Sequence, residues 1–139
     1  MEPSVTEIDL LKKIPLVSRH YVKLIDRALA PYQLSSSLYY YIVKLHEFGD
    51  LPQERIVQLT GINASNVTRA VQKLIDLHYL TKKENPEDRR GHLLSLTEEG
   101  EKMYPIIANC LADVHKEFLA PLSQEEQEIF IKSIQKLGH

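Results

Sequence analysis

The fold is decided by residues 53–96, which read QERIVQLTGINASNVTRAVQKLIDLHYLTKKENPEDRRGHLLSL. Apolar residues recur at steps of three and four over 53–60 and again over 64–78, which predicts two helices. Between them, Gly61 tolerates the positive φ that a tight turn needs, and Asn63 is a good N-cap for the second helix. This stretch therefore predicts a helix-turn-helix.

A β-hairpin is predicted directly after the second helix, because the apolar period changes there to two. Residues 79–84 and 92–96 are the predicted strands, and residues 85–91 between them are rich in turn formers. This arrangement places Arg89 and Arg90 at the tip of a polar loop. Helix, turn, helix and hairpin thus follow one another in about forty residues.

Two helices are predicted on the N-terminal side of this unit, over 7–29 and 36–48. Pro15 lies inside the first helix, where it is expected to kink the helix or mark a later start, and Pro31 ends it. Ser35 or Ser36 is the expected N-cap of the second helix, and Gly49 ends it. The expected buried stripe of the second helix consists of Leu38, Tyr41, Ile42, Leu45 and Phe48.

Two more helices are predicted on the C-terminal side. Thr97 is the expected cap of a long helix that Pro121 ends. Ser123-Gln-Glu-Glu126 has the pattern of a capping box and opens the last helix. The fold class is therefore mainly α with a small β-hairpin.

Composition bounds the function before any motif is considered. The 139 residues amount to about one domain, and the net charge of -2 gives no global sign of nucleic-acid binding. Cys110 is the single cysteine, which excludes an intramolecular disulfide and a Cys-rich zinc site. No apolar run approaches the roughly 20 residues of a membrane span. The N-terminus carries acids where a secretion signal would be basic, so we expect a cytoplasmic protein without membrane contact.

The polar face of the second helix of the unit carries the functional signal. Arginine can bind guanine through two hydrogen bonds, asparagine and glutamine can bind adenine in the same way, and hydroxyls serve either base. The alternative is that any exposed helix face looks polar. The β-hairpin predicted directly after the helix-turn-helix favours the interpretation that this face binds DNA. The residues of this face are Ser65, Asn66, Thr68, Arg69, Gln72, Lys73 and Asp76.

The distribution of charge supports this interpretation mildly. Residues 64–92 hold six basic and four acidic side chains, a net charge of +2. The rest of the chain holds 11 basic and 15 acidic side chains, a net charge of -4. A positive face on an acidic body would orient the protein on DNA.

At this point the sequence resembles the MarR/SlyA family of winged-helix transcriptional regulators, over nearly the whole chain. Residues 85–100, NPEDRRGHLLSLTEEG, are similar to the wing signature of the family, an Asp-x-Arg followed by a strand that ends in Leu-Thr-x-x-Gly. Ser65-Asn-Val-Thr-Arg69, followed by Lys73-Leu74, is similar to its recognition helix. The resemblance implies that Arg90 lies at the wing tip. Asp88 is expected to hold one of the neighbouring arginines in place.

The resemblance also implies a homodimer whose chain ends intertwine. The expected regions are an N-terminal dimerisation helix in 1–34, a winged helix-turn-helix lobe in 35–97 and C-terminal dimerisation helices in 98–139. The apolar stripes at both ends agree, since they are too long for a domain this small to cover alone. The implied function is a sequence-specific DNA-binding regulator, which we expect to be a repressor of a palindromic operator. The alternative is a winged-helix dimer that acts mainly through protein partners, with weak DNA specificity.

The residues expected to contact double-stranded DNA lie on the recognition helix, on the wing and at the start of the preceding helix. They are Gln53, Ser65, Asn66, Thr68, Arg69, Gln72, Lys73, Lys82, Arg89 and Arg90. No Gly-rich phosphate loop, nucleophile elbow or metal triad points to an enzyme, and no cofactor is expected. Six histidines are present without a tight metal-binding pattern, so no metal site is expected.

Relatives in the family bind small aromatic or anionic effectors in a crevice between the dimer helices and the DNA-binding lobe. The corresponding candidate pocket here consists of His20, Tyr21, Arg27, Tyr39 and Met103, with Arg27 as the carboxylate partner. The favoured alternative is that these five are packing and surface residues. Cys110 lies on an apolar stripe and is expected to be packing rather than a redox sensor.

Overall fold

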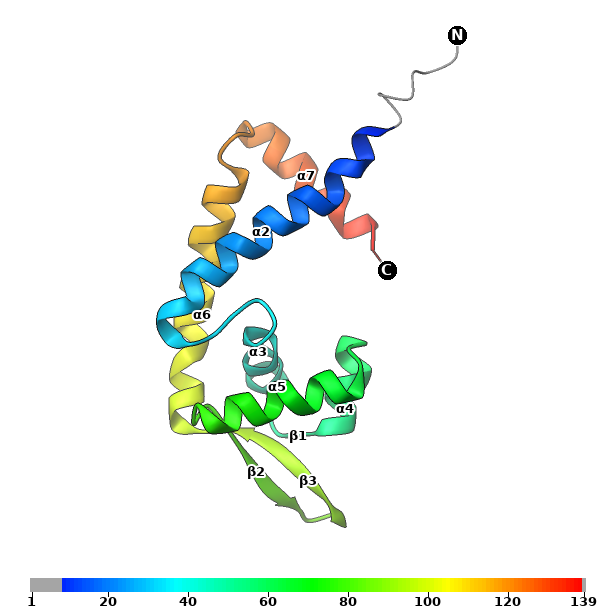
Figure 1. Cartoon of the computed structure of the whole chain (residues 1–139), viewed down its shortest axis with the longest axis vertical. Coiled ribbons are helices and arrows are strands. Elements are labelled where there is room, and N and C mark those ends of the chain that lie inside the picture. The colour runs from blue at the N-terminus through cyan, green and yellow to red at the C-terminus, as the bar shows by residue number, and fades with distance from the viewer. Residues whose placement is uncertain (1–8, 139) are drawn as a thin grey trace.

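The computed structural model describes residues 9–138, and of Arg89 and Arg90 it describes the backbone only. Helices form both ends of the chain, and a small sheet lies in its middle (Figure 1). The elements in chain order are η1 (Asp9–Lys12), α2 (Lys13–Leu29), η2 (Ala30–Tyr32), α3 (Tyr39–Phe48), β1 (Leu51–Pro52), α4 (Gln53–Thr60), α5 (Ala64–Asp76), β2 (Leu80–Asn85), β3 (Asp88–Leu96), α6 (Glu98–Leu119) and α7 (Gln124–Lys136).

The helix-turn-helix is confirmed, with α4 over the predicted range and α5 ending two residues early. Gly61 has φ 68° and donates its N–H to the Val57 carbonyl, so it makes the tight turn after α4. The Asn63 side chain accepts a hydrogen bond from the Ser65 N–H at 2.8 Å and caps α5. These local signals set the start and the end of the turn between the helices.

The sheet has three antiparallel strands in the order β1-β3-β2. The two-residue strand β1 was not predicted; it pairs with Leu93 and Leu94 of β3. The predicted seven-residue loop is wrong, because β2 runs to Asn85 and β3 begins at Asp88, with a bulge after Glu84. The backbone of Arg89 and Arg90 therefore lies in β3. None of the described side chains of the outer hairpin is buried, so charged residues are tolerated in its strands and the apolar alternation typical of a strand is missing.

The core joins the lobe to the first part of the long helices. The largest fully buried side chains are Tyr41, Ile25, Leu29, Ile42, Ile56, Leu74, Leu80, Leu94, Ile107, Val67 and Val71. They come from α2, α3, α4, α5, both long strands and α6. The lobe is therefore packed onto the C-terminal half of α2 and the N-terminal half of α6.

Two details of the N-terminal helices differ from the prediction. Helix α3 begins at Tyr39, without a side-chain cap, because the Ser36 N–H donates to Asp26 Oδ1 at 2.8 Å and holds the serines in a turn. Phe48 is 55% exposed and does not belong to the buried stripe.

Helix α2 begins at Lys13, so Pro15 lies in its first turn, where an N–H has no intrahelical partner. The late start is thus correct, and the start of the predicted helix, residues 7 and 8, lies outside the described residues.

The start of α6 is fastened to the residues that follow α5. The Thr97 side chain accepts from the Gly100 N–H at 3.0 Å, as predicted, and donates to the His78 carbonyl at 2.6 Å. Gly100 lies so close to the backbone of Tyr79 that a Cβ added at Gly100 would overlap the Tyr79 carbonyl oxygen. The predicted capping box at Ser123 is also confirmed, with both of its hydrogen bonds present.

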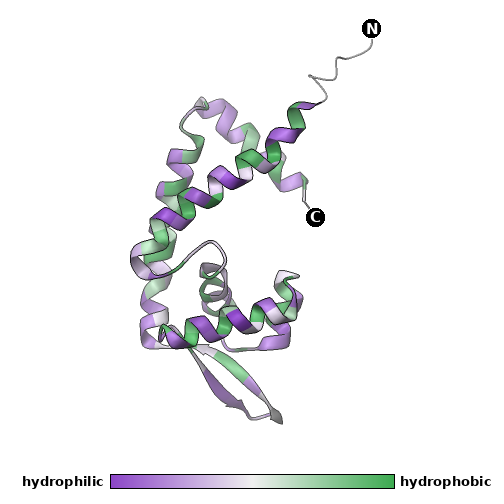
Figure 2. Ribbon diagram, in the orientation of Figure 1, coloured by the Kyte–Doolittle hydropathy of each residue, from purple (hydrophilic) through white to green (hydrophobic). Residues whose placement is uncertain are grey.

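The helices near the two ends of the chain carry apolar side chains that none of the described residues covers. No residue of η1 or α7 is buried. Figure 2 shows apolar bands along α2 and α7. The exposed side chains are Leu10, Leu11, Ile14, Leu16, Val17 and Val22 at one end and Ile129, Ile131, Ile134 and Leu137 at the other. Within residues 9–138, no helix is both long enough and apolar enough to cross a membrane.

Candidate nucleic-acid interface

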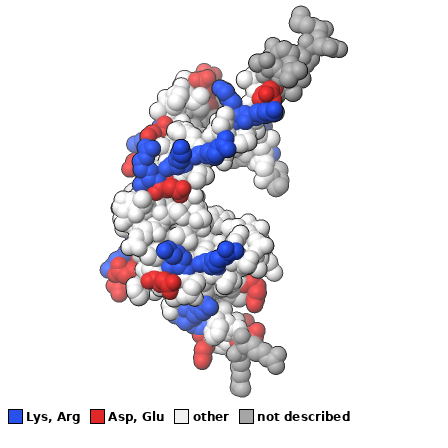
Figure 3. Space-filling view, in the orientation of Figure 1, with Lys and Arg blue, Asp and Glu red and all other residues white. Residues whose placement is uncertain are grey.

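Helix α5 has one buried and one exposed face. Val67, Val71 and Leu74 point into the core, with at most 1% of each exposed. Figure 3 shows Lys and Arg side chains gathered over this helix and along α2. The hairpin of β2 and β3 extends beyond α5 (Figure 1). The predicted contact residues Ser65, Asn66, Thr68, Arg69, Gln72 and Lys73 are all exposed on α5.

Hydrogen bonds orient several of these side chains. Arg69 Nη2 donates to Asn66 Oδ1 at 3.1 Å, which leaves the other guanidinium N–H groups available. Gln72 Nε2 donates to Asp76 Oδ1 at 3.0 Å one turn further along. Lys73 forms no ion pair with the residues that the structure describes. The exposed face therefore presents a guanidinium, an ammonium and two amides at one-turn spacing.

The start of α4 is tied to the same face. Gln53, the first residue of α4, donates from Nε2 to Thr68 Oγ1 at 2.9 Å. Thr68 Oγ1 in turn donates to the Ala64 carbonyl at 3.0 Å. Gln53 was predicted as a DNA contact, and the structure places it beside α5.

The charged residues of the wing differ in their surroundings. Lys82 is exposed on β2, whereas its neighbour Lys83 lies 3.9 Å from Asp50 Oδ2. Asp88 pairs with Asn85 across the hairpin, and its predicted role as a partner of a wing arginine stays a prediction. The side chains of Arg89 and Arg90 lie outside the described residues, so their DNA contacts also stay predictions.

Of the five residues of the predicted effector pocket, one lines the larger of the two described cavities, and the pocket itself stays a prediction. Tyr39 lines a cavity of about 640 Å³ between α3 and α5, and none of the other four lines it. Tyr21 donates to or accepts from His115 Nε2 at 2.9 Å on α6, and the ring of His20 stacks on Phe118. Met103 is buried in the core, and Arg27 is exposed at the end of α2.

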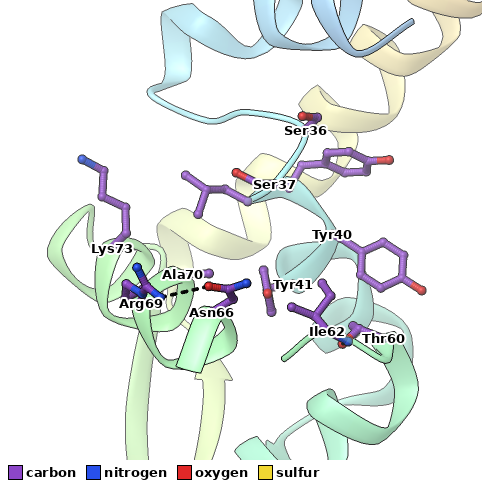
Figure 4. Close-up of a pocket in the computed structure, with 12 residues that line it drawn as sticks. Ser36, Ser37, Tyr40, Tyr41, Thr60, Ile62, Asn66, Arg69, Ala70 and Lys73 are labelled. Atoms are coloured by element: carbon purple, nitrogen blue, oxygen red, sulfur yellow. Dashed lines mark hydrogen bonds between the residues drawn. The ribbon is translucent and has the colours of Figure 1, made fainter. Parts of the chain in front are cut away.

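The lining of this cavity includes residues of the DNA face that sequence reasoning did not connect with an effector. Figure 4 shows Arg69, Asn66 and Lys73 on one side and Tyr40 and Ser37 on the other. Helices α3 and α5 meet only in the folded chain, so no local pattern marks the cavity. Two residues of the run of serines at 35–37, Ser36 and Ser37, line the cavity.

Burial sets the ionisation of the phenols and of the thiol. It raises the pKa of Tyr39 and of Tyr21, with a smaller contribution from a neighbouring phenol in each case. Burial also raises the pKa of Cys110, and Asp113 raises it further. Because the thiolate is the reactive form, this environment disfavours thiol sensing. No group of three or more His, Cys, Asp or Glu that could hold a metal ion occurs among the described residues.

A helix-turn-helix followed by a hairpin that pairs with a short third strand defines the winged-helix class of DNA-binding proteins. Residues 39–91 match the sequence profile of the MarR family. They contain α3, α4, α5 and most of the wing. Over this stretch the chain is therefore similar to transcriptional regulators of the MarR family.

Similar proteins are also found over most of the chain. The uncharacterized HTH-type transcriptional regulator YwoH of Bacillus subtilis is 29% identical over 121 residues, covering 87% of this chain and 88% of its own. A probable transcriptional regulator from Pseudomonas aeruginosa has a similar crystal structure, with a TM-score of 0.83, 25% identity and coverage of 90% and 93% of the two chains. A MarR variant from E. coli complexed with operator DNA shares the fold, with a TM-score of 0.80, 20% identity and coverage of 98% and 99%.

Proposed function

We propose that this chain is a sequence-specific DNA-binding repressor that acts as a homodimer on a palindromic operator. The observation that carries the proposal is the exposed polar face of α5 beside the wing. This face presents Arg69, Gln72 and Lys73, while the opposite face is buried in the lobe. The fold shared with a MarR variant that is complexed with operator DNA supports the same assignment.

In this proposal α5 enters the major groove and the wing follows the flanking minor groove. Arg69, Asn66 and Gln72 are the candidates for base contacts, because their side chains can make paired hydrogen bonds with base edges. Lys73, Lys82 and Gln53 are the candidates for phosphate contacts. Arg89 and Arg90 are proposed to reach the narrow minor groove, where the negative potential is enhanced.

The homodimer is supported by the uncovered ends of the chain. Ile129, Ile131, Ile134 and Leu137 of α7 are all exposed, and so are the apolar residues of η1 and the first half of α2. Large exposed apolar patches of this kind mark interaction surfaces. A second copy that covers them would hold two α5 helices at a fixed separation, about 34 Å for successive major grooves.

A small aromatic or anionic effector would act through that separation. The cavity beside Tyr39 lies between α3 and α5 and offers hydroxyls, aromatic rings and the two cations Arg69 and Lys73. An effector that prefers a dimer with another spacing of α5 lowers the affinity for DNA by linkage.

The test is a selection of genomic fragments by the purified full chain at moderate salt, followed by sequencing of the bound DNA. The expected result is an enriched near-palindrome with half-site centres about 10–10.5 base pairs apart. Enrichment no better than for random fragments would overturn the proposal and favour a winged-helix dimer that acts through protein partners. A steep loss of affinity with salt on the enriched duplex supports direct contact with its phosphates.

A further inference from the structure

A second cleft, of about 300 Å³, lies where the start of α4, the start of α5 and the wing meet. Lys82 of β2 and His92 of β3 line it, together with Gln53 and Ala64, the first residues of the two helices. The contact residues predicted from the sequence include Gln53 and Lys82 but not His92. This histidine is therefore a basic side chain of the cleft to which no role has been assigned.

The register of the hairpin puts the two basic groups on one face of the sheet. Lys82 pairs with Leu94, and Glu84 pairs with His92 two residues further along β3. Side chains two residues apart on a strand, and those directly opposite across a pair, point to the same face. Leu94 is buried, so this is the face that packs on the helices. Lys82 and His92 lie on the outer, exposed part of the same face.

This cleft borders the surface proposed to bind DNA. Gln53 lines the cleft and also donates to Thr68 on the exposed face of α5. A helix in the major groove is flanked on both sides by the sugar–phosphate backbone. A phosphate at the edge of the groove would therefore lie between α5 and the wing, next to Lys82 and His92.

The charge of the cleft depends on the histidine. Among the described side chains, Glu54 of α4 lines the cleft, and Glu84 of β2 lies directly opposite His92. Lys82 is the one permanent cation among these four residues. With a neutral imidazole the four residues carry a net charge of -1, and with a protonated imidazole they carry none. Asp88, whose carboxylate lies beside Gly91 of the lining, adds a further negative charge. One proton on the imidazole thus lowers the repulsion of a phosphate by one unit of charge.

We propose that this cleft holds a backbone phosphate of bound DNA, and that His92 is a phosphate contact whose strength depends on pH. The proposal rests on the DNA binding proposed above and adds a residue and a form of regulation to it. Histidine is the side chain whose charge ordinarily changes between pH 5 and pH 8. A protonated imidazole attracts the phosphate electrostatically, and a neutral one loses that attraction. The protein therefore binds DNA more tightly at acidic than at alkaline pH.

The experiment measures dissociation constants of the full chain for a labelled duplex of about 30 base pairs, long enough for two half-sites. A phosphate contact is independent of sequence, so the enriched duplex and a scrambled one are both used. Each is titrated over a range of salt concentrations at about pH 6 and about pH 8. The wild type is expected to bind about threefold to tenfold more tightly at the lower pH. At the lower pH, the logarithm of its binding constant falls more steeply with the logarithm of the salt concentration, by up to about 0.9 for each lobe.

Three variants isolate the residue. His92→Gln is expected to bind at both pH values like the wild type at about pH 8, whereas His92→Lys, with a permanent charge, binds at both like the wild type at about pH 6. Lys82→Gln lowers the salt slope by about 1 at both pH values, without changing sequence preference. The matched control is His46→Gln on α3, whose imidazole lies 3.0 Å from Glu101 and outside the cleft, and it keeps the wild-type difference.

The outcomes separate this inference from the function on which it rests. Duplex binding in which His92→Gln retains the wild-type dependence on pH overturns the role of His92 alone. Absence of duplex binding at either pH overturns the proposed function, and this inference with it. Thermal unfolding of each variant at both pH values distinguishes the loss of a phosphate contact from the loss of the folded structure.

Discussion

The middle and the ends of this chain differ in what covers their apolar side chains. In the lobe, Ile56, Leu74 and Leu94 are buried by other parts of the same chain. At the ends, Leu11 is 73% exposed and Leu137 is 72% exposed, although both belong to helices with regular apolar spacing or to their flanks. The difference teaches that the lobe shares one core with the adjoining halves of α2 and α6, whereas the ends have apolar surface that no described part of the chain covers.

The largest expected effect is a loss of stability in the middle. Leu74→Ala removes a fully buried side chain from α5 and leaves a cavity, so it is expected to lower the free energy of unfolding by about 2–5 kcal/mol. Urea unfolding monitored by circular dichroism measures the loss. Phe48→Ala, at a site that is 55% exposed, is the control and is expected to cost less than about 1 kcal/mol. Equal losses in the two variants would contradict the shared core.

The next effect concerns the ends. Ile134→Glu places a charge on the exposed apolar face of α7, so it is expected to weaken the proposed dimer at least about a hundredfold, or about 2.7 kcal/mol. Sedimentation equilibrium measures the dimer dissociation constant. Gln135→Glu adds the same charge at the neighbouring exposed position and serves as the control. A dimer that tolerates Ile134→Glu would show that this face is not the interface.

A third variant tests the joint between the two regions. Alanine normally favours a helix over glycine, yet Gly100→Ala is expected to destabilise the chain by about 1–3 kcal/mol. The reason is that the added Cβ would overlap the Tyr79 carbonyl oxygen, which is backbone and cannot move aside. Thermal unfolding measures the change. A rise in stability would mean that the contact between α6 and the end of α5 is looser than described.

The fourth effect falls on DNA binding alone. Arg69→Ala is expected to weaken binding of the enriched duplex by about 1–3 kcal/mol and to relax the preference at one base pair, while the dimer stays intact. Anisotropy titrations with single-base variants of the duplex measure both. Arg19→Ala is the control, because it removes the same charge from an exposed position on α2, outside the exposed face of α5. A uniform loss across all sequences would make Arg69 a phosphate contact instead of a base contact.

Sequence reasoning succeeded where the signals are local. Gly61, Asn63, Thr97 and the capping box at Ser123 act on backbone groups within a few residues, so each turn and cap was predictable from its own neighbourhood. The polar face of α5 was predictable for the same reason, because helical spacing alone sets which side chains share a face.

The errors fall where distant segments decide the structure. Helix α3 starts late because Asp26, ten residues before Ser36, holds that backbone N–H. The two residues of β1 form a strand because β3, more than forty residues later, offers them a partner. The same applies to the site: both clefts join helices or strands that are separated in the chain, so residues such as His92 gave no local signal.

The two-residue strand β1 has a further consequence for how copies of this chain associate. It lies at one edge of the sheet, and Pro52 has no N–H to offer to another strand. The opposite edge, β2, carries Lys82, Lys83 and Glu84 in a row, and charged side chains discourage the addition of strands. Both open edges are thus protected against sheet growth, which guards the lobe against aggregation through its edges. The proposed association of two copies is then left to the helices at the ends of the chain.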